Sequence, residues 1–213
     1  VRHGTREWVF LGYGWEMISC KVSASGPGVN PLRPRHVLNS LIRARREYPK
    51  ATIVLWMHWN YELELYPQPA HRQLAFDCID TGADAIIGAH SHRVQGIEWY
   101  QGKPVVYCLG NWMLPQGLFW NGDLKFPDVT RLQMAFEWTG DMDTAQVHWF
   151  DYDPDRAPLI RYRDSEFAVY SPRIRSLTPF AGQSLKEYQG WFRRNRVRRR
   201  GLPIYYGYRH GAR

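Results

Sequence analysis

Apolar and polar residues alternate in blocks along the first half of the chain, and each block has the length of a strand or a helix. Short apolar runs predict buried strands at residues 8–13, 52–57 and 85–88. Between them, residues 36–48 and 69–81 carry apolar side chains at helical spacing, and Gly82 is expected to cap the second helix. The order strand, helix, strand, helix, strand predicts right-handed crossovers and a parallel sheet.

The pattern changes after Arg93. Four further segments contain alternating or continuous apolar residues and predict short strands, at residues 96–100, 105–109, 131–138 and 146–152. Turn signals at Gln101-Gly102 and around Gly140 predict an antiparallel β half with little helix. Residues 153–178 predict irregular structure, and residues 184–199 a basic helix. We therefore expect one domain over residues 1–152 and an irregular, Arg-rich extension over residues 153–213.

Three histidines follow two of the predicted strands. His58 ends the run 52–57, and His90 and His92 come directly after the run 85–88. Ligands bind beyond the carboxyl ends of strands in parallel sheets, so these side chains are expected to be neighbours. Imidazole suits first-row transition metals near neutral pH. A single histidine beside a strand is more often structural, but three at this edge favour a metal site.

Several ordered motifs surround these histidines. They read HWNYE from His58, a proline at position 67, RQLA from Arg72, GADAIIGAHSHRVQGIE from Gly82 and GKPVVYCLGNW from Gly102. Together they resemble the CapA/PgsA family of capsule and poly-γ-glutamate synthesis proteins, within the calcineurin-like metallophosphoesterase superfamily. The resemblance runs from about Trp8 to about Pro115.

The resemblance implies an α/β fold, namely part of a calcineurin-like metallophosphoesterase α/β/β/α sandwich. It also implies a dinuclear centre of divalent transition metal ions, with Mn, Fe and Zn left open. His58 and His90 match ligands of one ion and His92 a ligand of the other. Glu62 and Asn111 match motif positions near the site and are the candidate catalytic residues.

The chain also departs from the family pattern. Asn60, Ala89, Ser91 and Cys108 replace the family's Gly, His, Pro and Ser. The superfamily's Asp-x-His, Gly-Asp-x-x-Asp and Gly-Asn-His segments, which supply carboxylate and further ligands, do not occur before Trp8. We therefore expect a C-terminal part of a longer protein, which by itself binds metal weakly and hydrolyses little.

The net charge of +8 belongs to the C-terminus. Eight of the 28 Lys and Arg residues are arginines after Tyr188, where no acidic residue occurs, and the remainder balances the 20 acidic residues. The cluster from Arg193 to Arg200 suggests contact with a polyanion, although a solvated tail is the simpler interpretation and nucleic acid the weaker one. No apolar run is long enough to cross a bilayer. The location, bacterial cytoplasm or cell envelope, stays open.

The remaining candidates for chemistry have simpler explanations. The three cysteines are widely spaced and predict small buried residues rather than a disulfide framework. Surface or packing roles are expected for the other histidines: His3, His36, His71, His148 and His210. Solvent exposure or helix capping, rather than catalysis, is expected for the carboxylates of Asp77, Asp80 and Asp84.

Two functions from different classes follow. The first is a metal-dependent phosphoesterase-like hydrolase in its full-length form, acting on a phosphoester or on an anionic polymer of the capsule. The second is a non-catalytic accessory that binds an anionic polymer or a synthase complex.

Overall fold

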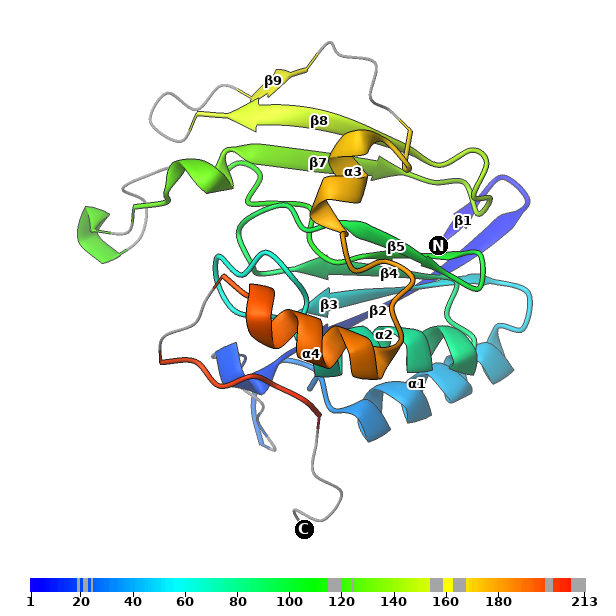
Figure 1. The fold of residues 1–213 in the computed structure, drawn as a ribbon. Helices are drawn as coiled ribbons and strands as arrows, with labels where there is room; N and C mark the ends of the chain where they lie inside the picture. Colours follow the sequence, from blue (N-terminus) through cyan, green and yellow to red (C-terminus); the bar gives the residue numbers. More distant parts are fainter. Residues whose placement is uncertain are drawn as a thin grey trace.

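The computed structural model describes residues 1–18, 20, 23, 25–114, 120–123, 125–153, 159–162, 168–197 and 201–207. Its elements form three layers (Figure 1), which are a layer of helices, a six-stranded sheet and a three-stranded sheet. The architecture is mixed α/β, with a mainly parallel sheet and a separate antiparallel sheet, as predicted. No helix among the described residues is both long and apolar enough to span a membrane.

The six-stranded sheet has the order β1-β2-β3-β4-β6-β5. Its strands are β1 (Arg2–His3), β2 (Arg6–Gly14), β3 (Thr52–His58), β4 (Ala85–Ala89), β5 (Ile97–Tyr100) and β6 (Lys103–Val106). The pairs β2–β3, β3–β4 and β4–β6 are parallel, whereas β1 and β5 pair antiparallel at the two edges. The parallel sheet is thus confirmed. It is larger than predicted, because β5 and β6 join it instead of the antiparallel half.

Three helices cover one face of this sheet: α1 (Pro34–Glu47), α2 (Pro69–Thr81) and α4 (Leu185–Asn195). Residues 69–81 form a helix with the predicted bounds, and Gly82 caps it in a left-handed conformation with φ 115°. The core beneath these helices joins apolar residues of α1 and α2 to alternate residues of β3, such as Leu41, Leu74 and Leu55. Helix α1 is therefore amphipathic as expected, whereas α2 is buried over most of its residues.

The opposite face carries the second sheet, in the order β7-β8-β9, with β7 (Leu132–Glu137), β8 (Gln146–Tyr152) and β9 (Leu159–Arg161). Its strands are antiparallel, and the predicted turn around Gly140 connects β7 to β8. Helix α3 (Pro172–Leu177) contributes Ile174 to the core between the two sheets. Both β9 and α3 lie in residues 153–178, which the sequence predicted to be irregular. Single turns of 3-10 helix occur at Glu16–Ile18, Trp120–Gly122 and Asp128–Thr130.

The predicted basic helix is α4, and it belongs to the core. Ser184 caps its first turn with Glu187 in a reciprocal capping box. Tyr188 and Phe192 are completely buried against the helical face of the main sheet. Arg193 and Arg194 are exposed at its last turn, whereas residues 198–200 lie outside the described residues. The arginine-rich end is therefore anchored by an apolar face.

A buried ion pair, which the sequence did not predict, connects these layers. Both guanidinium and carboxylate are almost fully buried, and Arg72 donates two bonds of 2.7 Å to Glu98. The Tyr107 hydroxyl donates to the same carboxylate at 2.6 Å, and Arg72 also donates to the Gln183 carbonyl at 2.9 Å. The bidentate geometry and the added donor offset part of the cost of removing both charges from water, although among the described residues Nη1 of Arg72 has no hydrogen-bond partner. The pair thereby joins α2 to β5, to the residue after β6 and to the segment before α4.

Candidate metal centre

The three predicted ligands lie at one edge of the main sheet. His58 ends β3, and its backbone pairs with Ala89, the last residue of β4 and the neighbour of His90. The ring centroids of His58 and His90 are 4.7 Å apart, and those of His90 and His92 are 5.5 Å apart. The predicted proximity of these side chains is confirmed. Their role as metal ligands stays a prediction.

The turn that carries the histidines is held in an unusual backbone conformation. His90 has φ 97° and His92 has φ 56°, a region that side chains with a Cβ rarely adopt. Each such residue costs about 1–3 kcal/mol and persists only where its surroundings impose it. Between them, Ser91 is fully buried, its hydroxyl donates to the Arg93 carbonyl at 3.0 Å, and its carbonyl accepts from the Leu63 N–H at 2.8 Å.

Gly88 is required by close packing beneath the same turn. A Cβ at this position would lie 2.0 Å from the Tyr107 carbonyl oxygen and 2.4 Å from Nε1 of Trp59. Trp59 is itself completely buried, and its Nε1–H donates to the Tyr107 carbonyl at 3.0 Å. Trp59, which follows His58, therefore packs against Gly88, which lies two residues before His90. This contact sets the separation of the two segments that carry the histidines.

Asn111 orients the ring of His92. Its Oδ1 lies 2.6 Å from Nδ1 of His92. When the amide oxygen accepts, Nδ1 carries the proton and Nε2 keeps its lone pair for a ligand. The Phe126 ring packs against the same imidazole at 5.4 Å. Asn111 thus lies where a residue that supports a metal ligand belongs.

The electrostatics of the cluster favour neutral imidazoles. Burial, followed by the nearby His58 and His92, lowers the pKa of His90 to about 3. Burial and then His92 also lower the pKa of His58. Nε2 of His90 is buried and has no hydrogen-bond partner among the described residues. A neutral imidazole with an unused nitrogen is the form that binds metal, so these donors fit a divalent transition metal ion.

The site contains few carboxylates. Glu62 lies on the loop after β3 and is exposed, and within the described part of the chain its carboxylate has no hydrogen-bond partner. Across that same part, no three His, Cys, Asp or Glu side chains are grouped closely enough to hold an ion. His58, His90 and His92 therefore lie near one another and near Asn111, but in the described part of the chain they do not form a three-ligand cluster, and no carboxylate joins them.

Comparison with known proteins identifies the family. Residues 10–116 match the family described as bacterial capsule synthesis protein PGA_cap. The chain belongs to this family. All four residues of the cluster lie inside the matched region, as do Glu62 and Gly88.

Curated relatives are similar over the same part of the chain. The PGA biosynthesis protein CapA of Bacillus subtilis (strain 168) is 36% identical over 91 residues, which cover 43% of this chain and 23% of that protein. The capsule biosynthesis protein CapA of Bacillus anthracis is 31% identical over 93 residues, with the same two shares. The uncharacterized protein y4sH of Sinorhizobium fredii (strain NBRC 101917 / NGR234) is 33% identical over 87 residues, 41% of this chain and 16% of that protein. The matched segment thus spans about a quarter or less of each relative.

The other histidines have structural surroundings, in the part of the chain that is described. His71 is buried among Trp15, Trp59 and Tyr205, with ring centroids 4.6–5.4 Å away. Burial, with a further contribution from His90, lowers the pKa of His71 to about 3. His71 is thus a packing residue, as predicted. His36 contacts Asn30 and His148 contacts Glu137, whereas His210 lies outside the described residues.

The other predicted structural residues also have defined partners. Cys78 and Cys108 are buried as expected, Cys20 is partly exposed, and all three are free thiols. Asp84 is not merely an exposed or capping residue, because its carboxylate bonds to Arg45, Lys103 and the Ile53 N–H at 2.6, 2.6 and 2.9 Å. It fastens the start of β4 to α1, β3 and β6.

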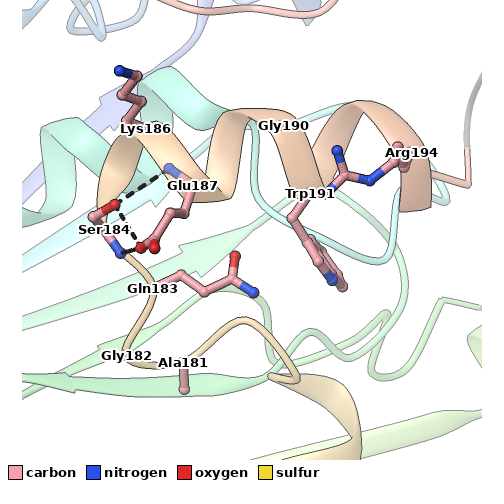
Figure 2. A pocket seen from close by; sticks show the side chains of 9 residues that line it. All are labelled: Ala181, Gly182, Gln183, Ser184, Lys186, Glu187, Gly190, Trp191 and Arg194. Carbon is pink, nitrogen blue, oxygen red and sulfur yellow. Dashed lines mark hydrogen bonds between the residues drawn. The ribbon is translucent and has the colours of Figure 1, made fainter.

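A wide, open hollow lies on another part of the surface, beside α4 (Figure 2). Trp191 and Arg194 line one end of it, and Ser184 and Glu187 the other. The hydrogen bonds drawn between Ser184 and Glu187 are those of the capping box, which occupies these polar groups. This hollow therefore presents a cationic and aromatic surface rather than a second cluster of metal ligands.

Proposed function

We propose that this chain supplies the histidine ligands of a divalent metal centre in a capsule or poly-γ-glutamate biosynthesis protein. The observation that carries the proposal is the convergence of His58, His90 and His92 at one sheet edge, with Asn111 bonded to His92. The names of the two CapA relatives support the biosynthetic context. The full-length protein would then be a metal-dependent hydrolase of the phosphoesterase type.

In this proposal each residue has a defined task. His58 and His90 would hold one ion and His92 the other, while Asn111 would keep the proton of His92 on Nδ1. The bound metal supplies Lewis acidity to a phosphoryl or related centre and lowers the pKa of water. The exposed Glu62 is the proposed acid–base group. Manganese, iron and zinc all suit imidazole donors, so the proposal leaves the metal open.

The chain alone should bind metal weakly, because no three His, Cys, Asp or Glu side chains among its described residues are grouped closely enough to hold an ion. Titration with Co²⁺, followed by its visible absorption, measures this. Replacing His58, His90 or His92 by Ala should lower affinity by more than about tenfold, since even losing an outer partner of a ligand costs 10- to 100-fold. His148→Gln is the control, because that residue lies on β8 in the second sheet. Equal affinity in all variants would disprove the site.

Catalysis is tested with the full-length protein. We expect metal-dependent hydrolysis of bis(p-nitrophenyl) phosphate that is lost in His92→Ala and retained in His148→Gln. Little turnover is expected from residues 1–213 alone. A full-length protein that binds metal without turnover would favour the accessory function.

The accessory function has its own support. Lys186, Trp191 and Arg194 of α4 line the hollow, with Arg194 beside Trp191, and Arg193 is also exposed. Arg196 adds less to the exposed positive charge than predicted, because it is buried and donates to the Leu202 carbonyl at 2.6 Å. An anionic polymer would bind here mainly through charge, with affinity that falls steeply with salt.

Retention on a column carrying poly-γ-glutamate tests this second function. Arg193→Gln with Arg194→Gln should elute at lower salt than the unchanged chain. The matched control is Arg43→Gln with Arg46→Gln, which removes the same charge from exposed positions on α1. Equal elution of the two double variants would mean that only net charge is sensed.

A further inference from the structure

A buried carboxylate lies on the loop that bonds to the histidine turn, and it is not one of the residues that the family motif points to. Glu64 is completely buried, two positions after the exposed Glu62. Its Oε1 accepts from three backbone N–H groups, those of Leu65 at 3.0 Å, Tyr66 at 3.4 Å and Val197 at 3.0 Å. A carboxylate is buried at high cost unless such donors surround it.

The Val197 donor is distant in sequence. It lies just past α4, 133 positions from Glu64. The neighbouring bonds fix this segment in place: the Tyr188 hydroxyl donates to the Pro67 carbonyl at 2.6 Å, and the Tyr205 N–H donates to Oε1 of Gln68 at 3.0 Å. The C-terminal segment therefore holds the loop between β3 and α2 from the outside.

The same loop contacts the histidine turn on its other side. The Leu63 N–H donates to the carbonyl of Ser91, the residue between His90 and His92, at 2.8 Å. Nε2 of Gln95 donates to the Glu64 backbone carbonyl at 2.8 Å. Leu63 itself has φ 60°, so the loop adopts a strained conformation to make these bonds.

We propose that Glu64 is a positioning residue for the histidine centre, which couples the C-terminal segment at Val197 to the turn of His90 and His92. The Val197 N–H donates to the Glu64 carboxylate, which also accepts from Leu65 and Tyr66 of the same loop. Leu63, the residue before Glu64, donates to Ser91 between the two histidines. This inference rests on the proposed metal function, because positioning matters only if the imidazoles bind a ligand. The contact between Val197 and the loop exists whether or not metal is bound.

The Val197 N–H can be removed with little other change. The side chain of Val197 is 49% exposed, so it contributes little packing. Arg196, the residue before it, has ψ 141°, which is the conformation that a following proline requires. Val197→Pro therefore deletes the donor, and Val197→Ala is the matched control that keeps it.

Amide hydrogen exchange and Co²⁺ titration form the test. In Val197→Pro, the Leu63 N–H should exchange at least about tenfold faster, and Co²⁺ affinity should fall about tenfold, the size expected for losing an outer partner of a ligand. Val197→Ala should match the unchanged chain in both. Glu64→Gln, which keeps the shape and loses the charge, should show an intermediate loss.

Unchanged Leu63 exchange in a folded Val197→Pro chain would overturn the proposal, as would a lower unfolding temperature with unchanged Co²⁺ affinity. If Val197→Pro does not fold, the unchanged protein decides: coupling is reciprocal, so Co²⁺ should slow exchange at Leu63 and Val197 together. Slowing at Leu63 alone overturns the proposal. A chain that binds no Co²⁺ contradicts the metal function, whereas the exchange measurements on the variants still decide the coupling.

Discussion

Oδ1 of Asn111 lies 2.6 Å from Nδ1 of His92, so an amide from the loop after β6 orients an imidazole from the turn after β4. The two residues come from different motifs, 19 positions apart. We expect Asn111→Ala to lower Co²⁺ affinity by about 10- to 100-fold, because no hydrogen bond then fixes the tautomer and the orientation of the His92 ring. Asn39→Ala, on the exposed face of α1, should leave the affinity unchanged. Similar affinities for both variants would show that Asn111 does not orient a ligand.

Gly88→Ala should destabilise the fold strongly, because the new methyl group collides with the Tyr107 carbonyl and the Trp59 ring. Overpacking of this kind costs about 1–3 kcal/mol or more. Urea denaturation measures the free energy of unfolding. Gly12→Ala is the matched control, since no atom lies within 4 Å of a Cβ at that position. A small effect at Gly88 would mean that β4 and Trp59 separate easily.

His71 should make the protein less stable in acid. Burial, followed by the nearby His90, lowers its pKa to about 3, while in the unfolded chain its pKa returns to the ordinary 6.5. Between these values the unfolded state binds the extra proton, so stability is complete above about pH 6.5 and falls as the pH drops toward 3. His71→Phe should reduce the loss of unfolding free energy between pH 7 and pH 5. Parallel pH profiles for the two proteins would show that His71 is not buried in a neutral form.

The carboxylate of Asp84 is stabilised in its charged form, in contrast to the imidazole of His71, which is stabilised in its neutral form. Burial raises its pKa, but bonds from Lys103, the Ile53 N–H and Arg45 outweigh burial and lower the pKa overall. Asp84 therefore stabilises the fold fully at pH values above its pKa in the unfolded chain. This stabilisation is lost as the pH falls through the lowered pKa of the folded state. Asp84→Asn should cost about 1–3 kcal/mol at pH 7, and less in strong acid. Asp143→Asn, at an exposed turn, is the control, and an equal cost for both would contradict this role.

Local patterns predicted the elements of the first half well. Residues 69–81 form the predicted helix because apolar positions repeat at helical spacing and Gly82 ends the pattern. The strand ends at His58 and before His90 followed from short apolar runs. The pairing of β6 with β4 was not predicted, because a short strand carries no signal that selects its neighbour.

The sequence by itself determined the alternating helices and strands, the family motifs and the proximity of His58 to His90, because each depends on local periodicity or on the direction of parallel strands. Only the tertiary structure decided that Glu64 rather than Glu62 is buried, that Arg72 pairs with Glu98, and that Val197 contacts the loop after β3. Burial of a charge depends on donors that arrive from distant segments. For Glu64 one of the donors is an N–H from 133 positions away, and no local pattern encodes that approach.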